Sequence, residues 1–330
     1  MKVLITGGAG YIGSHMALAL LDQGNDVVIL DNLATGSKLI VPPKANFIEG
    51  DISDLNLVQK ILNEHNFDAV THFAGSVKVE ESVLNPIKYY NNNTVKTLHF
   101  LNCLINSNVT KFIFSSTAAI YKEKKSGLIS ETHSCNPSNP YGQSKLMCEN
   151  IIKDLSKSTN LKFFILRYFN VAGADPQLRS GQMDVKSNHL IKSCIDCVIK
   201  KREFIEIYGT DYDTQDGSCV RDFIHVSDLI SGHLLAIKHL VNGGDSDICN
   251  LGYGKGLSVL EIVKRVKLIS KIDYNTKIVG RRKGDVSRVV ANSNKMMSKY
   301  NWKPKLDDLN DIISTALNWE KQKLKILHET

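Results

Sequence analysis

A tyrosine and a lysine stand four residues apart, as Tyr141 and Lys145, in the segment "NPYGQSK". Pro140 suits the first position of a helix, and Asn139 or Ser138 can cap that helix. Residues at positions i and i+4 are neighbours on one face of a helix. We therefore expect the phenol and the ammonium to lie side by side.

This pair has the types of group that acid–base chemistry needs. A free tyrosine has a pKa of about 10 and is a poor base near neutral pH. Lowering that pKa to about 7 requires about 4 kcal/mol, and a lysine charge about 4 Å away contributes a similar amount at an effective dielectric of about 20. Such a tyrosine can take a proton from a substrate hydroxyl while a hydride leaves the same carbon. The spacing alone is common in helices, so this chemistry needs further support.

A glycine-rich loop near the N-terminus provides that support. Gly7, Gly10 and Gly13 follow the strand-like run "KVLIT" and precede a helical pattern, which is the arrangement that binds the pyrophosphate of a dinucleotide at a helix N-terminus. Asp31 ends the next strand-like run, 18 residues after Gly13, and Asn32 follows it. A carboxylate at this position accepts hydrogen bonds from the ribose hydroxyls and repels a 2′-phosphate, which favours NAD over NADP.

Strand-like and helical segments alternate through the first half of the chain. The strand-like runs are 2–6, 26–31, 46–51, 69–75, 111–116 and 163–170, and the helical patterns are 11–23, 55–64, 82–107 and 141–159. This order predicts an α/β fold with a Rossmann-type doubly wound parallel sheet. In the last helix, Met147, Ile151 and Leu155 form the expected core stripe.

The regular alternation of strand-like and helical segments ends at about residue 170. We expect an NAD-binding Rossmann domain at 1–170 and a smaller C-terminal α/β substrate lobe at 171–330, with a helix and a strand in 223–254 packing back on the first domain. Strand carboxyl ends face the ligand crevice in such a sheet. The hydroxyls of Ser115, Ser116 and Thr117, which close one strand, are therefore placed to bind a reacting oxygen.

Composition limits the class of protein. The 330 residues are 42% hydrophobic with a net charge of +7 and scattered lysines, which suits a phosphate-bearing small substrate better than nucleic acid. The opening "MKVLITGG" is too short for a signal peptide or a membrane span, so we expect a cytoplasmic protein. Seven irregularly spaced cysteines fit a reducing compartment, and the lone Cys194-x-x-Cys197 has no second pair of ligands, so no metal site is expected.

Longer blocks extend these observations over the whole chain. With Thr117, the tyrosine and the lysine resemble the triad of the extended short-chain dehydrogenase/reductase superfamily. The blocks that narrow the resemblance to the UDP-glucose 4-epimerase family are "MKVLITGGAGYIGSH", "VVILDNL", "EGDISD", "HFAG", "ESV", "YYNNN", "NPYGQSKLMCE", "LRYFNVAGA", "YGTDYDTQDGSCVRDFIHVSDL", "NLGYG" and "RRKGD". The glycine pattern is shared with many other activities, whereas "GSCVRDFIHVSDL" is highly specific.

The resemblance implies a role for each matching residue. Thr117 would hydrogen-bond the sugar O4, Tyr141 would be the acid/base, and Lys145 would hold the nicotinamide ribose and tune the tyrosine. Further NAD contacts would be Tyr11, Ile12, Asp31, Asn32, Asp51, Ile52, Phe73, Ala74, Gly75, Asn93 and Tyr168. The UDP-sugar would meet Asn170, Asn188, Leu190, Tyr208, Arg221, Arg282, Asp285 and Val289. The family also implies a homodimer formed through helices in 82–107 and 141–159.

The chain departs from the family pattern at a few positions. Lys122 and Glu123 follow Tyr121 where glycine is usual, and Val77 stands where some relatives carry a lysine. Val289 stands where some relatives have a tyrosine. A smaller side chain there leaves room for an N-acetyl group, so UDP-N-acetylglucosamine is an expected second substrate.

Other functions compete with epimerisation. A nucleotide-sugar 4,6-dehydratase needs an acid pair after the active-site threonine, and Ala118-Ala119 occupy that place. An ordinary alcohol dehydrogenase has no use for the diphosphate arginines. A non-enzymatic NAD-sensing module would not need the complete triad, and an epimerase for another UDP-sugar, N-acetylated or pentose, remains the nearest alternative.

Overall fold

The computed structural model describes residues 1–122, 126–184, 188–282 and 285–329. The chain divides into two compact units. The first contains Met1–Lys122, Thr132–Tyr168 and Ile230–Cys249, and the second contains Glu123–Glu131, Phe169–Leu229 and Asn250–Thr330. The expected boundary at 170 lies two residues after Tyr168, and 123–131 of the expected 1–170 domain falls in the second unit. Within 223–254, only 230–249 belongs to the first unit.

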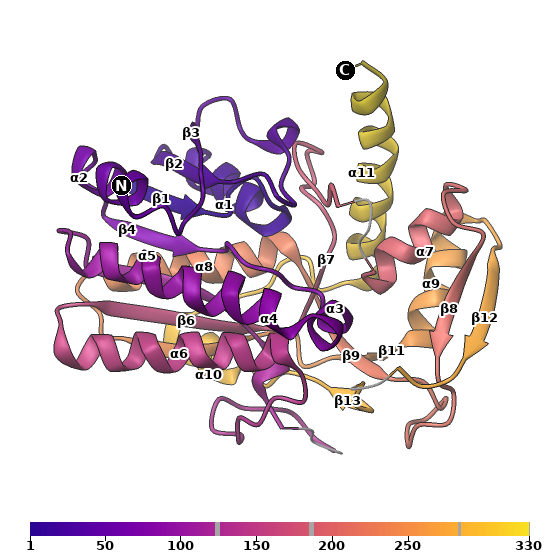
Figure 1. Ribbon diagram of the computed structural model, residues 1–330. Helices are drawn as coiled ribbons and strands as arrows, with labels where there is room; N and C mark the ends of the chain where they lie inside the picture. Colours follow the sequence, from indigo (N-terminus) through magenta and orange to yellow (C-terminus); the bar gives the residue numbers. More distant parts are fainter. Residues whose placement is uncertain (123–125, 185–187, 283–284, 330) are drawn as a thin grey trace. The chain divides into compact units, whose positions relative to one another are not determined.

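A seven-stranded sheet forms the frame of the first unit (Figure 1). Its strands, in spatial order, are β10 (Asp247–Leu251), β6 (Lys162–Tyr168), β5 (Lys111–Thr117), β4 (Ala69–His72), β1 (Lys2–Thr6), β2 (Asp26–Asp31) and β3 (Asn46–Glu49). β1 pairs in parallel with both β2 and β4, so the strand order reverses there and the carboxyl ends of β1 and β4 flank the expected ligand crevice. The predicted doubly wound sheet is confirmed.

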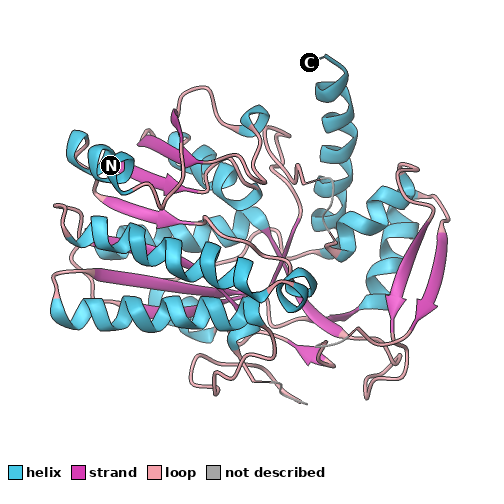
Figure 2. Ribbon diagram, in the orientation of Figure 1, coloured by secondary structure: helices cyan, strands magenta, loops and turns pink. Residues whose placement is uncertain are grey.

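Helices cover both faces of this sheet, as Figure 2 shows in cyan. They are α1 (Tyr11–Leu21), α2 (Leu55–Glu64), α3 (Val79–Leu84), α4 (Pro86–Tyr89), α5 (Lys96–Ile105), α6 (Pro140–Ser158) and α8 (Val226–Val241), with 3-10 turns at Lys38–Ile40 and Ala118–Ile120. None of the described helices is both long and apolar enough to cross a membrane.

The single helical pattern expected at 82–107 is wrong in detail. α3 ends at Leu84, and Pro86 starts α4, with the Asn85 side chain accepting a hydrogen bond from the Lys88 amide. Proline cannot continue a helix because it lacks the amide proton and restricts the residue before it. A π-helical segment, Tyr90–Val95, then joins α4 to α5. Such segments are rare and are frequently found at functional sites.

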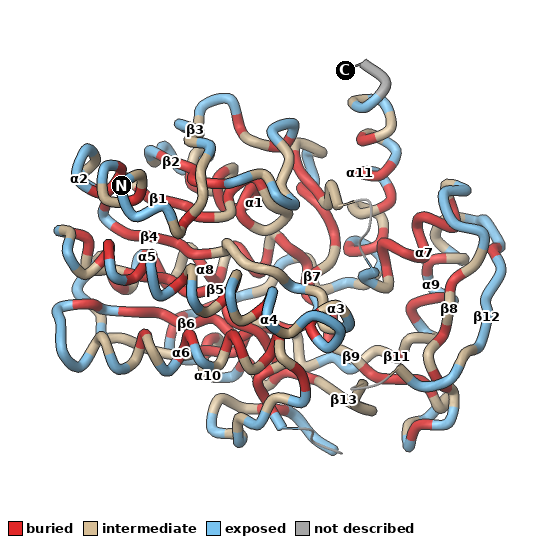
Figure 3. Tube along the Cα trace, viewed as in Figure 1, coloured by how far each residue is buried: buried red, intermediate tan, exposed pale blue. Residues whose placement is uncertain are grey.

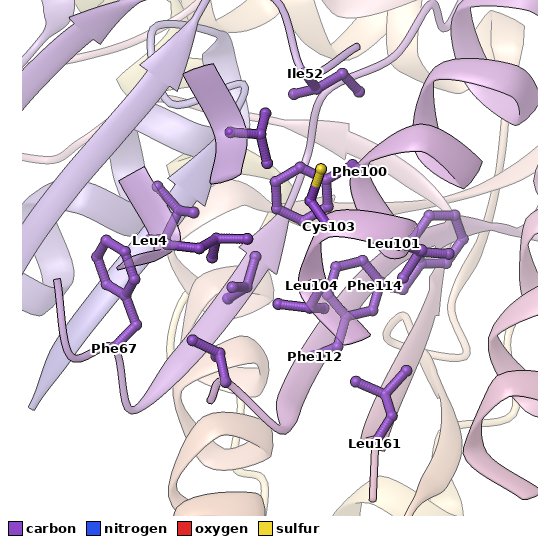
Figure 4. Packing of buried hydrophobic residues seen from close by; sticks show 14 of the residues in the cluster. Leu4, Ile52, Phe67, Phe100, Leu101, Cys103, Leu104, Phe112, Phe114 and Leu161 are labelled. Atoms are coloured by element: carbon purple, nitrogen blue, oxygen red, sulfur yellow. The ribbon is translucent and has the colours of Figure 1, made fainter. Parts of the chain in front are cut away.

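One face of the sheet packs against α2, α5 and α6. Phe100 and Leu104 of α5 lie fully buried against Phe112 and Phe114 of β5 and Leu4 of β1 (Figure 4). Each such side chain contributes about 1.5–3 kcal/mol when it is removed from water. Figure 3 shows the strands of this unit as a largely buried core.

The core stripe predicted for α6 is wrong at Met147, which is 38% exposed. Ile151 and Leu155 are partly buried and pack against the core, as predicted. The fully buried side instead carries Lys145 and Glu149. Apolar periodicity missed this face because charged side chains are buried only when partners satisfy them, and those partners come from distant strands.

The second unit is built around β9 (Val220–His225). β9 pairs with β11 (Gly256–Ser258), β13 (Arg288–Val289) and β7 (Asn170–Ala172), while β8 (Phe204–Tyr208) pairs with β12 (Asn275–Val279). Its helices are α7 (Leu190–Val198), α9 (Val259–Ser270), α10 (Asn294–Tyr300) and α11 (Leu309–Glu329). Apolar side chains of α7, α9 and α11 form its main core.

A buried ion pair joins α6 to the sheet of the first unit. The Glu149 Oε2 atom is 2.6 Å from Arg167 Nη2, and Glu149 Oε1 accepts from Arg167 Nε at 3.0 Å and from the Ser116 hydroxyl at 2.6 Å. Arg167 Nη1 donates to the Tyr121 hydroxyl at 3.0 Å. The carboxylate side chain is fully buried, so its free energy depends on these partners.

We expect Glu149→Ala to destabilise the protein by about 3–5 kcal/mol, because it leaves the Arg167 guanidinium buried without its charge partner. The double variant Glu149→Met/Arg167→Met should lose less than either single change, since apolar groups of similar volume can replace a buried pair. Urea unfolding midpoints measure the effect, with Glu80→Ala on the exposed side of α3 as the control. A Glu149→Ala midpoint equal to that of the control would contradict this account.

Candidate active site

The glycine loop fits a bound dinucleotide. Gly7 has φ +73, and a Cβ atom added to it would lie 2.6 Å from the Ala74 amide nitrogen. A Cβ on Gly13 would lie 2.2 Å from the Gly7 carbonyl oxygen, whereas one on Gly10 would meet that oxygen alone, at 3.2 Å. Gly7 and Gly13 therefore allow the loop to pack closely against the residues after β4 and against its own backbone. Gly10 leaves the outer side of the loop free of a side chain. Gly10, the N-cap residue of α1, has no side chain to cap the helix, so an anion can take that place.

Asp31 connects the end of β2 to this loop. Its side chain is 8% exposed, and it accepts hydrogen bonds from the Ala9 amide at 2.9 Å and the Leu33 amide at 2.8 Å. Burial raises the pKa of the carboxyl, and these two bonds oppose that change. The residue expected to bind the ribose thus also fixes the backbone of the loop.

Asn32 and Asp51 form a second polar group at the same edge of the sheet. Asn32 Nδ2 donates to Asp51 Oδ2 at 2.8 Å, and Lys96 Nζ lies 2.6 Å from the same oxygen. Burial raises the pKa of the Asp51 carboxyl. Hydrogen bonds from Lys96, Ser53 and Asn32 outweigh that effect and together hold the pKa well below its usual range. Ile52, the next residue, is buried.

Thr117, Tyr141 and Lys145 come together at the carboxyl end of β5. Thr117 is the last residue of β5, and Tyr141 and Lys145 lie in the first turns of α6, where Asn139 Oδ1 caps the helix by accepting from the Gly142 amide at 2.9 Å. The Thr117 side chain lies beside the Tyr141 phenol. Lys145 Nζ donates to the Ser115 carbonyl at 2.9 Å and lies 4.7 Å from the centre of the Phe114 ring.

The electrostatics of the tyrosine differ from the sequence prediction. Burial raises the pKa of Tyr141, and the bond from Thr117 lowers it in part. Burial also lowers the pKa of Lys145. The closed surroundings penalise a phenolate, and the ammonium of Lys145 donates to the Ser115 carbonyl.

The π-helical segment positions the chain that follows β4. Asn93, 2% exposed, accepts from the Ser76 amide at 2.7 Å and donates to the Ser76 carbonyl at 3.0 Å and to the Ser144 hydroxyl at 3.0 Å. Ser144 in turn donates to the Tyr141 carbonyl at 2.8 Å. Asn93 therefore ties the segment after Phe73, Ala74 and Gly75 to the helix turn that carries the tyrosine.

Tyr89, Glu81 and His233 support the site in the first unit, and the sequence analysis did not identify them. Tyr89 is fully buried, accepts from the Lys78 amide and donates to Glu81 Oε2, both at 2.9 Å, and its ring lies edge-on to Tyr141 with centroids 6.3 Å apart. His233 of α8 lies 5.1 Å from the Phe73 ring and 6.2 Å from the Tyr168 ring. Glu81 and Tyr89 are part of the family blocks "ESV" and "YYNNN", but their supporting role becomes evident only from the contacts in the structure.

Tyr168 and Tyr11 complete the candidate cofactor residues. The Tyr168 hydroxyl is 2.6 Å from the Ser115 hydroxyl, so it lies beside the carbonyl that holds Lys145. Tyr11 begins α1, and its ring meets His15 edge-on at 5.3 Å. Ile12 follows Tyr11 in the first turn of the same helix.

The candidate substrate residues of the second unit form two groups. In one, the Arg282 guanidinium lies 4.0 Å above the Tyr208 ring. In the other, Arg221 Nη2 lies 3.6 Å from Asp285 Oδ1, and Val289 is the register partner of Arg221 in the β13–β9 pair.

The remaining candidates lie on other elements of this unit. Asn170 begins β7, Leu190 begins α7, and Asn188 is exposed two residues before Leu190. Arg281, the neighbour of Arg282, pairs with Asp211 at 2.9 Å and stacks on Tyr212 at 4.2 Å, which distinguishes the two arginines.

Much of the specific "GSCVRDFIHVSDL" block is structural. Asp222 accepts from the amides of Tyr253, Gly254 and Ala291 at 2.9–3.1 Å. Asp228 accepts from the amides of Lys305 and Leu306 and from the Tyr253 hydroxyl. Each carboxylate thus joins backbone segments distant in sequence. Arg221 Nη1 donates to the Val220 carbonyl at 3.0 Å, and its Nη2 atom faces Asp285.

Besides Val289, which lies half-buried in β13, the departures from the family pattern lie at the surface or outside the described residues. Val77, where some relatives carry a lysine, is 53% exposed. The Lys122 amide donates to the Ser134 carbonyl at 2.9 Å, and Glu123 lies outside the described residues.

Comparison with known proteins supports one interpretation of this geometry. The family model described as NAD dependent epimerase/dehydratase family matches residues 3–252. A UDP-glucose 4-epimerase of Azospirillum brasilense is 44% identical over 97% of this chain and 92% of its own length.

Solved structures agree with that match. A UDP-glucose 4-epimerase crystal structure has a TM-score of 0.95 at 42% identity, with 98% of both chains covered. The UDP-Glc/GlcNAc 4-epimerase of Campylobacter jejuni has a TM-score of 0.85 at 44% identity, covering 97% of this chain and 99% of its own. With a glycine loop that fits a dinucleotide and a Thr–Tyr–Lys group at the end of β5, this chain belongs to the NAD dependent epimerase/dehydratase family.

Proposed function

We propose that this protein is an isomerase, a UDP-glucose 4-epimerase that interconverts UDP-glucose and UDP-galactose with tightly bound NAD. The observation that carries the proposal is the buried group of Thr117, Tyr141 and Lys145 beside a dinucleotide loop. It occurs in a chain that matches UDP-glucose 4-epimerases over nearly its full length. An epimerase for another UDP-sugar is the nearest alternative.

The reaction needs a group that can oxidise and re-reduce one carbon. Bound NAD supplies a reversible hydride acceptor for the sugar C4, so that a transient 4-keto sugar can be reduced again on its other face. Tyr141 takes the O4 proton and later returns it, as a general base and then a general acid. Thr117 would hydrogen-bond O4, and its hydroxyl lowers the pKa of Tyr141, which favours the phenolate.

The chain has residues suited to each part of the cofactor. The pyrophosphate would lie against the loop of Gly7, Gly10 and Gly13, and Asp31 would accept from the adenosine ribose. Lys145 would hold the nicotinamide ribose. The other proposed NAD contacts are Tyr11, Ile12, Asn32, Asp51, Ile52, Phe73, Ala74, Gly75, Asn93, Tyr141 and Tyr168.

The second unit has groups suited to UDP. Guanidinium groups form paired hydrogen bonds to phosphate oxygens, and we assign Arg221 and Arg282 to the diphosphate. Asp285 holds Arg221, and the Tyr208 ring supports Arg282 from one side. Asn170, Asn188 and Leu190 would meet the sugar or the uridine.

We also propose a cytoplasmic homodimer. All seven cysteines are free thiols, which suits a reducing compartment. Val95, Leu98 and Met147 are 40%, 45% and 38% exposed, and they lie on the segments through which the family is expected to dimerise. Burying such apolar side chains favours association.

Tyr141→Phe should retain NAD but lose at least about 100-fold in turnover, because it removes the proposed acid/base. Turnover of UDP-glucose and the dinucleotide released on denaturation measure the two effects. Tyr274→Phe, which changes a buried tyrosine of the second unit, is the control and should keep wild-type turnover. Near wild-type turnover of Tyr141→Phe would remove the tyrosine from the mechanism.

Thr117→Val should move the pH profile of kcat/KM to higher pH. The Thr117 hydroxyl lowers the pKa of Tyr141, so its loss raises that pKa and reduces the phenolate fraction at any given pH. The limb of the profile that rises with pH should therefore shift upward, while Thr117→Ser retains the wild-type limb. Superimposable profiles for valine and wild type would show that this bond does not tune the base.

Val289→Tyr should suppress epimerisation of UDP-N-acetylglucosamine and spare that of UDP-glucose. The valine is the register partner of Arg221, and a tyrosine ring there would fill the space of an acetamido group at a cost of about 1–3 kcal/mol. Parallel assays of both sugars with wild type and variant measure the discrimination. Equal loss of both activities, or a wild type without N-acetylated product, would reject this assignment.

A further inference from the structure

Helix α11 carries two charged residues and a tryptophan that are almost completely buried. Trp319, Glu320 and Lys323 are each 1% exposed. Lysine and glutamate are buried to this degree only when they are paired. The identity of their partners therefore indicates what this part of α11 holds in place.

Two of these side chains bind one backbone carbonyl. Lys323 Nζ donates to the Gln182 carbonyl at 3.0 Å, and Trp319 Nε1 donates to the same oxygen at 3.3 Å. A Cβ atom on Gly181 would lie 2.4 Å from Trp319 Cδ1, so the chain passes directly against the indole. The backbone at 181–182 is thereby fixed to α11.

The third side chain connects α11 to the start of α7. Glu320 Oε1 accepts from Lys323 at 2.7 Å, and Glu320 Oε2 lies 3.5 Å from Lys192 Nζ. Lys192 also pairs with Asp196, one turn further along α7. Lys192 is the third residue of α7, two positions after Leu190 and four after Asn188.

We propose that Trp319, Glu320 and Lys323, here called the α11 brace, position the uridine-binding segment of this enzyme. The brace contacts described residues before Asn188 and after Leu190, by hydrogen bonds to the Gln182 carbonyl and by an ion pair to Lys192. Its members are positioning residues, because they act through the backbone and through Lys192. The inference rests on the proposed function, since that function gives Asn188 and Leu190 their ligand.

Stability alone does not account for this arrangement. Apolar side chains of similar volume can replace a buried ion pair without loss of stability, and the contact between α7, α9 and α11 is already built on an apolar core. Charged groups with fixed hydrogen bonds instead define one position for the backbone that they hold. A segment held in its binding conformation loses less conformational entropy when a ligand binds.

The test compares UDP binding and turnover in the full-length, NAD-loaded protein. Lys323→Met removes the main bond to Gln182, and Lys192→Met removes the contact on the other side. Each should raise the Kd for UDP and the KM for UDP-glucose by about tenfold. We expect kcat to stay within about twofold and the NAD content to stay unchanged, because neither side chain contacts the triad or the cofactor loop.

Ile313→Ala is the matched control, since Ile313 is a fully buried apolar residue of the same helix. It should lower the melting temperature and leave the UDP Kd unchanged. If Lys323→Met does not fold, Trp319→Phe gives a milder test, because it removes one donor to Gln182 and retains an aromatic ring. It should weaken UDP binding by about threefold.

An unchanged Kd for UDP in folded Lys323→Met and Lys192→Met would overturn the proposed role of the brace. An equal rise of the Kd for UDP in Ile313→Ala would overturn it as well. Calorimetry with UDP itself does not depend on the sugar or on turnover. A wild type that binds UDP but epimerises no UDP-glucose would therefore contradict the proposed function and leave the Kd comparison to decide on the brace.

Discussion

The buried pair of Glu149 and Arg167 determines where the reactive groups of the first unit lie. Tyr141, Lys145 and Glu149 are separated by four residues each, so they share one face of α6. Glu149 binds Arg167 of β6 and Ser116 of β5, the residue before Thr117. Because an unpaired buried charge is costly, the helix cannot rotate or slide without breaking these bonds. The carboxylate thereby fixes the register of the tyrosine against the threonine.

That register has a consequence for acid–base chemistry. The face of α6 that carries Glu149 is buried, and burial raises the pKa of Tyr141. Lys145 is held by the Ser115 carbonyl, so the phenol depends on Thr117 and on the positive charge of a bound nicotinamide for ionisation.

The sequence allowed the glycine loop, Asp31 and the Tyr–Lys pair to be predicted because their signals are local. Spacing along one strand, loop or helix is sufficient to recognise each of them. The errors concern groups whose partners are distant in sequence. Met147 was placed in the core because apolar periodicity ignores Lys145 and Glu149, which are buried with partners from other strands.

The same reason explains the residues that were missed. Asp222 and Asp228 bind backbone amides far along the chain, and nothing within "RDFIHVSD" separates these structural carboxylates from a ligand-binding one. Tyr89 and His233 gain their roles from the ring packing beside Tyr141 and Phe73. Likewise, the brace on α11 depends on contacts between residues more than 100 positions apart in the chain.

In the proposed reaction, the protein performs a redox-neutral exchange at C4 with cofactor that it already holds. The most direct measurement is incubation of the purified protein with UDP-glucose deuterated at C4, without any added dinucleotide. We expect UDP-galactose that retains the deuterium at C4. Dependence of product formation on added NAD, or replacement of the deuterium by solvent hydrogen, would contradict the proposed reaction.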